Sequence, residues 1–243
     1  KGKYSLKKRD GDFYIFNKAN QFRDEIKPIL PIWLEKKTLI KTDTEKVFFY
    51  NSILSEPRFD IAINLMKYSR DDVKKKLKKH NIICSFTKNS TVGITVNNRI
   101  PNNTLIKIKS DMFEVQDEGS QLMTLLIGVE KNMKILDMCA GKGTKTILMS
   151  NLLKSEGTIT AYDKIKERLS ILKSRVNKLK LKNINFDFDM KSKDQFDLVL
   201  CDVPCSGTGI WRRRPENIIW LNNEDLEKFK FVQNNILFNA AKL

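Results

Sequence analysis

The second half of the chain alternates apolar runs with amphipathic segments, and this alternation is its clearest structural signal. Short apolar runs predict four strands, at residues 133–138, 158–162, 184–188 and 196–203. Helical spacing of apolar residues predicts helices at 144–153 and 165–181. Strands that alternate with helices favour a parallel sheet covered on both faces, so an α/β fold is expected. A ligand site then belongs at the carboxyl ends of the strands.

The first half of the chain shows shorter and more varied patterns. Apolar side chains at 59, 61, 63 and 65 alternate with less apolar neighbours, which predicts a half-buried strand. The runs at 82–86 and 92–96 predict two further strands. Residues 1–55 are expected to form short helices with a strand at 47–50. We therefore predict a helical segment at 1–55, a small α+β unit at 56–110 and a second domain at 111–243.

A lysine-rich helix is predicted inside the small α+β unit. Ser69 stands three residues before Asp72, the spacing of an N-terminal capping box. Val73 and Leu77 then share one helix face, while the rest of the segment 74–79 is lysine. His80 is expected to cap the carboxyl end of this helix.

The charge of the chain is strongly positive and unevenly distributed. Lys and Arg number 45 against 29 Asp and Glu in 243 residues, for a formal net charge of +16. Up to Ser110 the count is 24 against 11, so most of the excess lies in the first half. A segregated basic excess predicts a polyanionic partner such as a nucleic acid. The alternative is a biased composition in which lysines only solvate an ordinary surface.

Composition also limits where the protein acts. The chain has no apolar run near the roughly 18 residues of a membrane span, so no membrane partner is expected. Its four cysteines include no CxxC pair, which argues against a zinc site or a disulfide scaffold. We therefore expect a reduced, intracellular protein without a metal, with a monomer favoured.

A glycine-containing loop after the first predicted strand of the second domain is the first candidate site. It runs over residues 137–146 as DMCAGKGTKT and precedes a helix N-terminus. Glycines there let the backbone approach a ligand closely. Asp163 follows the next strand, where a carboxylate accepts hydrogen bonds from ribose hydroxyls. Together they predict a nucleoside-containing cofactor. The loop matches neither the dinucleotide-binding motif GxGxxG nor the Walker A motif GxxxxGK[ST] in full, so a dinucleotide site and a nucleotide-triphosphate site are less favoured.

The second candidate site follows the fourth predicted strand, in the run Asp-Val-Pro-Cys-Ser-Gly-Thr-Gly. It presents the carboxylate of Asp202 and the thiol of Cys205 at the ligand-binding edge of the sheet. A carboxyl group there suits a hydrogen bond to a ring nitrogen, and an activated thiol suits nucleophilic or base chemistry. Arg212, Arg213 and Arg214 are expected to stabilise a thiolate or contact phosphate. The alternative is a buried cysteine beside a capping aspartate.

With both motifs, the sequence resembles the RsmB/Sun (NOL/NOP/Sun) family of S-adenosylmethionine-dependent RNA cytosine-5 methyltransferases. The resemblance runs from about Pro57 to the end, and the segments 136–146 and 202–209 carry it most specifically. It implies a Rossmann-like class I methyltransferase sheet with a smaller N-terminal α+β domain that binds RNA. The attacking cysteine of the family lies in a Thr-Cys motif, which is expected beyond Leu243, so the methyltransferase domain is expected to be incomplete here.

The resemblance also implies roles for individual residues. Asp163 would hold the ribose of S-adenosylmethionine, and Arg168 matches an arginine in the following helix. Asp189 is the expected acid on the adenine side, with Asp187 as the alternative. Asp202 would contact both the cofactor and the cytosine. The methionine part of the cofactor would be cradled by Cys139, Ala140, Gly141, Lys142, Gly143, Thr144 and Lys145, the last pairing with its carboxylate.

The expected reaction is methylation of cytosine C5 in ribosomal or transfer RNA through a covalent cysteine adduct. A thiolate adds at C6, Asp202 stabilises the ring at N3, and Cys205 assists release of the adduct. The family's loop reads Ala-Pro-Gly-Gly-Lys-Thr, whereas Lys142 and Thr144 replace its proline and one glycine. A catalytically impaired RNA-binding scaffold and a DNA cytosine-5 methyltransferase are the alternatives. The compartment is left open among nucleolus, nucleus, cytoplasm and organelle.

Overall fold

The computed structural model describes residues 30–98, 108, 111–154, 156–190 and 195–243. The chain divides into two compact units. One comprises Arg58–Val203 with Gln233–Leu243, and the other comprises Lys1–Pro57 with Pro204–Val232. The predicted helices in the first 29 residues lie outside the described residues. The predicted division at residue 110 stays a prediction.

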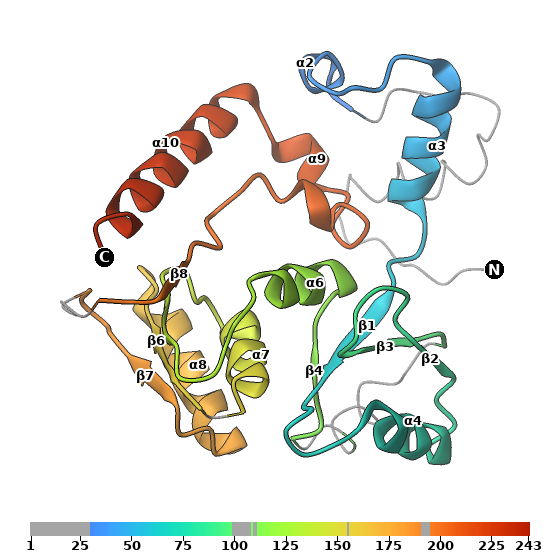
Figure 1. The fold of residues 1–243 in the computed structure, drawn as a ribbon. Coiled ribbons are helices and arrows are strands. Elements are labelled where there is room, and N and C mark those ends of the chain that lie inside the picture. Colours follow the sequence, from blue (N-terminus) through green and yellow to red (C-terminus); the bar gives the residue numbers. More distant parts are fainter. Residues whose placement is uncertain (1–29, 99–107, 109–110, 155, 191–194) are drawn as a thin grey trace. The chain divides into compact units, whose positions relative to one another are not determined.

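A four-stranded parallel sheet forms the centre of the larger unit, as the strand and helix alternation predicts (Figure 1). Its spatial order is β7-β6-β5-β8, with the ligand-binding edge at the carboxyl ends of the strands. The strands are β5 (Lys134–Asp137), β6 (Thr158–Ala161), β7 (Ile184–Phe186) and β8 (Leu198–Leu200). Helices α7 (Thr144–Leu152) and α8 (Lys166–Leu179) follow β5 and β6. The predicted α/β fold is confirmed.

The core of this sheet consists of aliphatic side chains from the strands and the two helices. Ile135, Ile159 and Ala161 of the strands have no exposed surface, nor do Leu169 and Leu172 of α8. Burial of each such large side chain contributes about 1.5–3 kcal/mol. The resulting rigid layer supports the loops at the carboxyl ends of the strands.

An antiparallel sheet in the order β2-β3-β1-β4 precedes the parallel one (Figure 1). Its strands are β1 (Phe59–Ile63), β2 (Cys84–Phe86), β3 (Gly93–Val96) and β4 (Phe113–Val115). The sheet thus takes its fourth strand from beyond residue 110, at a segment where the apolar pattern predicts no strand. Because three residues are too few to show a period, only pairing with β1 defines β4.

Strand β1 is buried on both faces, so the predicted half-buried strand is wrong in its burial. Ile61 and Ile63 pack against Val73 and Leu77 of helix α4 (Arg70–Lys79). On the other face Asp60 is only 3% exposed, and its Oδ2 accepts a hydrogen bond from the Glu118 N–H, 3.1 Å away. The polar position Asp60 in the alternating pattern of β1 therefore makes a hydrogen bond inside the protein and does not face solvent.

Helix α4 begins as predicted. The Ser69 hydroxyl accepts a hydrogen bond from the Asp72 N–H at 3.1 Å, and the Asp72 carboxylate accepts one from the Ser69 N–H at 3.3 Å. The Ser69 hydroxyl also donates to the Asp72 carboxylate at 2.6 Å, and this contact, followed by the one from the Ser69 N–H, lowers the pKa of Asp72. His80 occupies the C-cap position, as expected. The pattern of two buried residues and five lysines therefore gives one apolar face and one cationic face.

Helix α6 (Glu118–Leu126) is absent from the elements that the apolar pattern predicts. Its first N–H is held by Asp60, a residue 58 positions earlier. Gln121 and Thr124 on its inner face are completely buried although both are polar. The spacing of apolar residues therefore does not reveal this helix, because its buried face carries polar side chains whose hydrogen bonds are made inside the protein.

The described part of the second unit is helical and contains α2 (Ile32–Glu35), α3 (Asp43–Leu54), the short η1 (Thr208–Ile210) and α9 (Asn217–Trp220). Helix α10 (Asn223–Ala240) crosses from this unit into the larger one. The buried core of this helical unit consists of Leu30, Leu34, Tyr50, Ile53, Trp211, Ile218 and Leu221. Among the described residues, no helix is both long and apolar enough to cross a membrane.

The strand predicted at 47–50 is wrong, because these residues lie in the middle of α3. A capping box starts the helix: the Thr42 hydroxyl accepts from the Glu45 N–H at 3.2 Å, and Glu45 accepts from the Thr42 N–H at 3.0 Å. Val47 and the aromatic residues after it favour a strand by propensity. The cap and the burial of Tyr50 and Ile53 on one face outweigh that preference.

A carboxylate joins the ends of β1 and β4. Asp111 accepts a hydrogen bond from the Lys67 ammonium at 2.6 Å and one from the Tyr68 hydroxyl at 2.8 Å. The Asn64 amide donates to the Asp111 carbonyl at 3.0 Å. The contact with Lys67 is the main cause that lowers the pKa of Asp111 to about 2. The ionised carboxylate therefore stabilises the folded state.

We expect Asp111→Asn to lower the free energy of unfolding at pH 7 by about 1 kcal/mol, less than the full pKa shift because water screens this partly exposed pair. The contribution is present above the unfolded pKa of 3.8 and is lost as the pH falls toward 2. Urea denaturation at pH 7 and at pH 3 measures both effects. Glu130→Gln, at an exposed site, is the control. An equal loss at the two pH values would contradict the ion-pair interpretation.

Candidate functional site

The glycine-containing loop lies between β5 and α7, at the carboxyl edge of the parallel sheet. Gly141 and Gly143 adopt positive φ angles of 55° and 83°. A Cβ atom on Gly143 would lie 1.9 Å from the Leu172 Cδ1 of α8. Glycine is therefore required at 143 for both conformation and space. The helix α7 N-terminus follows at once, so its free N–H groups point toward the loop.

Asp163 fastens this loop to the end of the neighbouring strand. It is 7% exposed, and its Oδ2 accepts a hydrogen bond from the Gly141 N–H at 2.8 Å. Its Oδ1 accepts from the Ile165 N–H at 2.8 Å. The two predicted halves of the cofactor site, the loop and the acid, thus meet in space. Each carboxylate oxygen has a second lone pair for a ligand hydroxyl.

The structure also brings together two predicted site residues that follow different strands, Lys145 after β5 and Asp202 after β8. The Lys145 ammonium lies 2.5 Å from the Asp202 Oδ2, although the two are 57 positions apart. Lys145 is on the first turn of α7, and Asp202 follows β8 by two residues. The predicted partner of Lys145 is a cofactor carboxylate, whereas in this structure the ammonium pairs with the proposed catalytic acid.

Asp137, the last residue of β5, is a further member of the site. It is 1% exposed, and the Thr146 hydroxyl donates to its Oδ2 at 2.7 Å. Burial raises the pKa of Asp137 to about 6, and the nearby charge of Asp202 adds to this effect. The Cys139 N–H is near enough to lower this pKa, but no donor among the described residues is in hydrogen-bonding geometry with Oδ1. The sequence signal was an acid closing an apolar strand directly before the loop.

Three cysteines are unsuited to act as nucleophiles. Burial raises the pKa of the Cys139 thiol to about 12, and the charge of Asp137 contributes. Burial likewise raises the pKa of Cys84 and of Cys201. Both are half-buried and pack against apolar clusters. A thiol that stays protonated neither attacks nor accepts a proton.

Two residues predicted on the adenine side lie further along the same edge. Asp189 pairs with the Lys166 ammonium at 2.7 Å, an exposed contact that raises the pKa of Lys166. Its N–H donates to the Asp187 carboxylate at 3.1 Å, so the two candidate acids share one turn. Arg168 is exposed on the first turn of α8.

Cys205 is exposed and lies three residues after Asp202, in the segment assigned to the other unit. Within that unit, Arg212 donates to the Ser52 carbonyl at 2.7 Å and to the Ser52 hydroxyl at 2.5 Å. Its guanidinium therefore anchors the segment to α3. The expected role of the three arginines toward a thiolate or phosphate stays a prediction. Trp211 is 6% exposed and belongs to the core.

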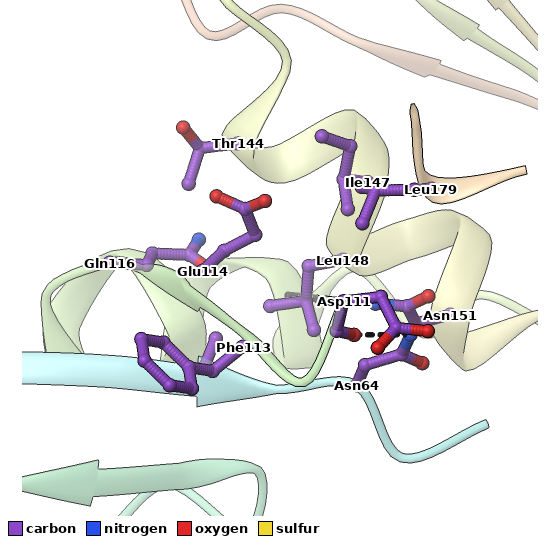
Figure 2. Close-up of a pocket in the computed structure, with 11 residues that line it drawn as sticks. Asn64, Asp111, Phe113, Glu114, Gln116, Thr144, Ile147, Leu148, Asn151 and Leu179 are labelled. Carbon is purple, nitrogen blue, oxygen red and sulfur yellow. Dashed lines mark hydrogen bonds between the residues drawn. The ribbon is translucent and has the colours of Figure 1, made fainter. Parts of the chain in front are cut away.

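A small cavity of about 10 Å³ lies between the antiparallel sheet and α7 (Figure 2). Phe113 and Glu114 of β4 line one side, and Thr144 and Ile147 of α7 line the other. Such a volume holds at most one water molecule. The cavity is therefore a packing gap between the antiparallel sheet and α7 and not the cofactor site.

Comparison with known proteins agrees with these features. Residues 123–243 match the model of the 16S rRNA methyltransferase RsmB/F family. The probable ribosomal RNA small subunit methyltransferase B of Bacillus subtilis is 30% identical over 136 residues, which are 53% of this chain and 30% of that protein. The human 28S rRNA (cytosine(4447)-C(5))-methyltransferase is 28% identical over 187 residues, 74% of this chain and 23% of that protein.

The fold also matches a solved structure, that of NSun6 from Pyrococcus horikoshii with SFG. The TM-score is 0.74 at 17% identity, over 86% of this chain and 79% of that chain. The chain spans less than half the length of the two curated relatives. Through residues 123–243, it therefore belongs to the RsmB/F family of rRNA methyltransferases, as its two motifs predict.

Proposed function

We propose that the protein transfers a methyl group from S-adenosylmethionine to C5 of a cytosine in RNA, with ribosomal RNA as the favoured substrate. The observation that carries this proposal is the contact of Lys145, on the cofactor loop, with Asp202, in the motif for the base. It brings the cofactor half and the base half of the site to one edge of the sheet. The printed functions of the bacterial and human relatives support the substrate class.

The residues at the loop fit S-adenosylmethionine. Asp163 would accept hydrogen bonds from the ribose hydroxyls. At Gly141 an added Cβ atom would meet no atom closer than 4.0 Å, so the backbone there is open to close approach. Asp137 Oδ1 is a buried acceptor without a hydrogen bond among the described residues, which suits the cofactor's ammonium group. The solved structure of NSun6 from Pyrococcus horikoshii, which has a similar fold, is a structure with SFG, an analogue of this cofactor. When bound, the cofactor supplies an electrophilic methyl group on a sulfonium.

The protein's own groups would activate the cytosine. A thiolate adding at C6 makes C5 nucleophilic; after methylation, loss of the C5 proton lets the thiol leave and restores the ring. Asp202 would hydrogen-bond the ring at N3 and stabilise the charge that develops there. By resemblance to the family, Cys205 assists release, and attack at C6 is assigned to a cysteine of a Thr-Cys motif.

The cationic face of α4 supports RNA as the partner. Lys75, Lys76, Lys78 and Lys79 are all exposed on it. Nearby, the partly exposed ring of Phe86 has the Arg70 guanidinium 4.4 Å and the Lys74 ammonium 4.6 Å from its centre. An aromatic ring among cations suits contact with both phosphates and unpaired bases. Action on ribosomal RNA implies a location inside the cell.

An RNA-binding scaffold without methyl transfer is the second candidate. The specific observation that favours it is the loop sequence, in which Lys142 and Thr144 replace the family's proline and one of its glycines. Binding of S-adenosylmethionine separates the two candidates, because a scaffold has no use for the cofactor.

For the cofactor, we expect Asp163→Ala to raise the dissociation constant of S-adenosylmethionine at least tenfold, since the ribose acceptor and the fastening of Gly141 are lost together. Isothermal titration calorimetry measures the constant, and a thermal melt reports on folding. Glu167→Ala is the control, because it removes an exposed acid at the start of α8. Unchanged affinity in Asp163→Ala would contradict the assignment of the ribose.

For catalysis, we expect Cys205→Ser in the full-length protein to accumulate a covalent RNA adduct, visible as a band of reduced mobility on a denaturing gel. The reason is that release fails while attack continues. Asp202→Asn should lower kcat about 100-fold or more without accumulating the adduct. Loss of activity in Cys205→Ser without an adduct would instead make Cys205 the nucleophile. Label from methyl-labelled S-adenosylmethionine in DNA and not RNA would reject the RNA substrate.

For RNA binding, we expect the triple variant Lys75→Gln, Lys78→Gln, Lys79→Gln to bind RNA more weakly. The slope of log affinity against log salt should fall by about 2, at roughly 0.7 per lost phosphate contact with a single strand. Filter binding between 50 and about 200 mM salt measures the slope.

The matched control removes three exposed lysines from α8 and its C-cap, in the variant Lys173→Gln, Lys178→Gln, Lys180→Gln. It changes the net charge by the same amount. An equal loss of slope in both variants would mean that overall charge, and not the face of α4, binds the RNA.

A further inference from the structure

Arg175 of α8 joins the cofactor loop to the antiparallel sheet. Its Nη1 donates a hydrogen bond to the Lys142 carbonyl of the loop. Its Nη2 pairs with the Glu114 Oε2 at 2.7 Å. The two side chains are 24% and 15% exposed, so the pair is well shielded from water. A guanidinium is suited to this place, because its planar fork donates in two fixed directions.

On the loop side, the contact fixes the residue before an obligatory turn. Lys142 precedes Gly143, whose φ of 83° starts α7. Gly143 lies against Leu172, one turn before Arg175 on the same face of α8. Lys142 and Gly143 of the loop therefore both contact one face of α8. Gly143 packs against it, and the Lys142 carbonyl accepts a charge-assisted hydrogen bond from Arg175.

On the other side, Glu114 belongs to β4 and lies opposite Ala62 of β1 in the sheet register. This sheet also packs against α4, which carries the exposed lysines. In Figure 2 the Glu114 carboxylate points from β4 toward Thr144, the first residue of α7. One path from the cationic helix to the loop thus runs through this ion pair.

We propose that Arg175 is a positioning residue for the cofactor: it holds the Lys142 carbonyl, and so the loop, in the conformation that binds S-adenosylmethionine. Through Glu114 it also couples this conformation to the antiparallel sheet, so that RNA bound on that sheet strengthens cofactor binding. By linkage, the cofactor strengthens RNA binding by the same factor. This inference rests on the proposed function.

The test separates the loop contact from the ion pair. Arg175→Gln loses the charge and should raise the dissociation constant of S-adenosylmethionine about tenfold. The exchange Arg175→Glu with Glu114→Arg restores an ion pair and should return the melting temperature to that of the wild type. A glutamate has no donor for the Lys142 carbonyl, so the exchange should leave the dissociation constant raised about tenfold.

Three outcomes would overturn the proposal. Wild-type affinity in Arg175→Gln would show that the loop does not depend on this side chain. Wild-type affinity in the exchange variant would show that the ion pair alone is needed. Equal cofactor affinity of the wild type with and without RNA would remove the coupling. If Arg175→Gln does not fold, Arg175→Lys replaces it, because an ammonium reaches only one of the two acceptors and should raise the constant threefold or more.

A different result would contradict the proposed function itself. If the wild-type chain shows no binding of S-adenosylmethionine in the calorimeter, both the proposed function and the role of Arg175 are rejected. If the wild type binds and the variants bind equally well, only the role of Arg175 is rejected.

Discussion

The carboxylate of Asp163 is the interaction on which the site depends. It receives the N–H groups of Gly141 and Ile165, and so ties the loop after β5 to the loop after β6. Parallel neighbouring strands bring such loops to one edge, but they do not fix their conformation. A buried carboxylate with two backbone donors does fix it, because moving either loop would leave a charge unsatisfied. The same oxygens stay available to a ribose.

Around this anchor, the acids at the sheet edge differ in environment. Asp137 is buried and has a pKa raised to about 6, whereas Asp202 is half-exposed and pairs with Lys145. One carboxylate is therefore suited to a cationic ligand held inside, and the other to a group that arrives from solvent. Lys145 pairs with Asp202, and a cofactor carboxylate bound at Lys145 would take the place of that partner.

The antiparallel sheet contributes polar contacts as well as an apolar core. Asp60 accepts from the Glu118 N–H and from the Thr95 hydroxyl, and Glu118 accepts from the N–H groups of Asn89 and Ser90. Each buried carboxylate has several donors, which offsets the cost of removing its charge from water. Such a network fixes the start of α6 relative to β1. The sheet that carries the cationic helix is thereby a rigid platform.

The sequence by itself determined the parallel sheet, the capped cationic helix and the positions of both motifs. These features depend on short-range signals: apolar runs, the Ser69 cap, and glycines and acids at strand ends. Only the tertiary structure decided that 47–50 is helical, that β4 joins the first sheet, and that Lys145 meets Asp202. It also decided the contacts of Arg175 with Lys142 and Glu114. The physical reason is that these outcomes depend on contacts between residues far apart in the chain, and local propensity carries no information about such partners.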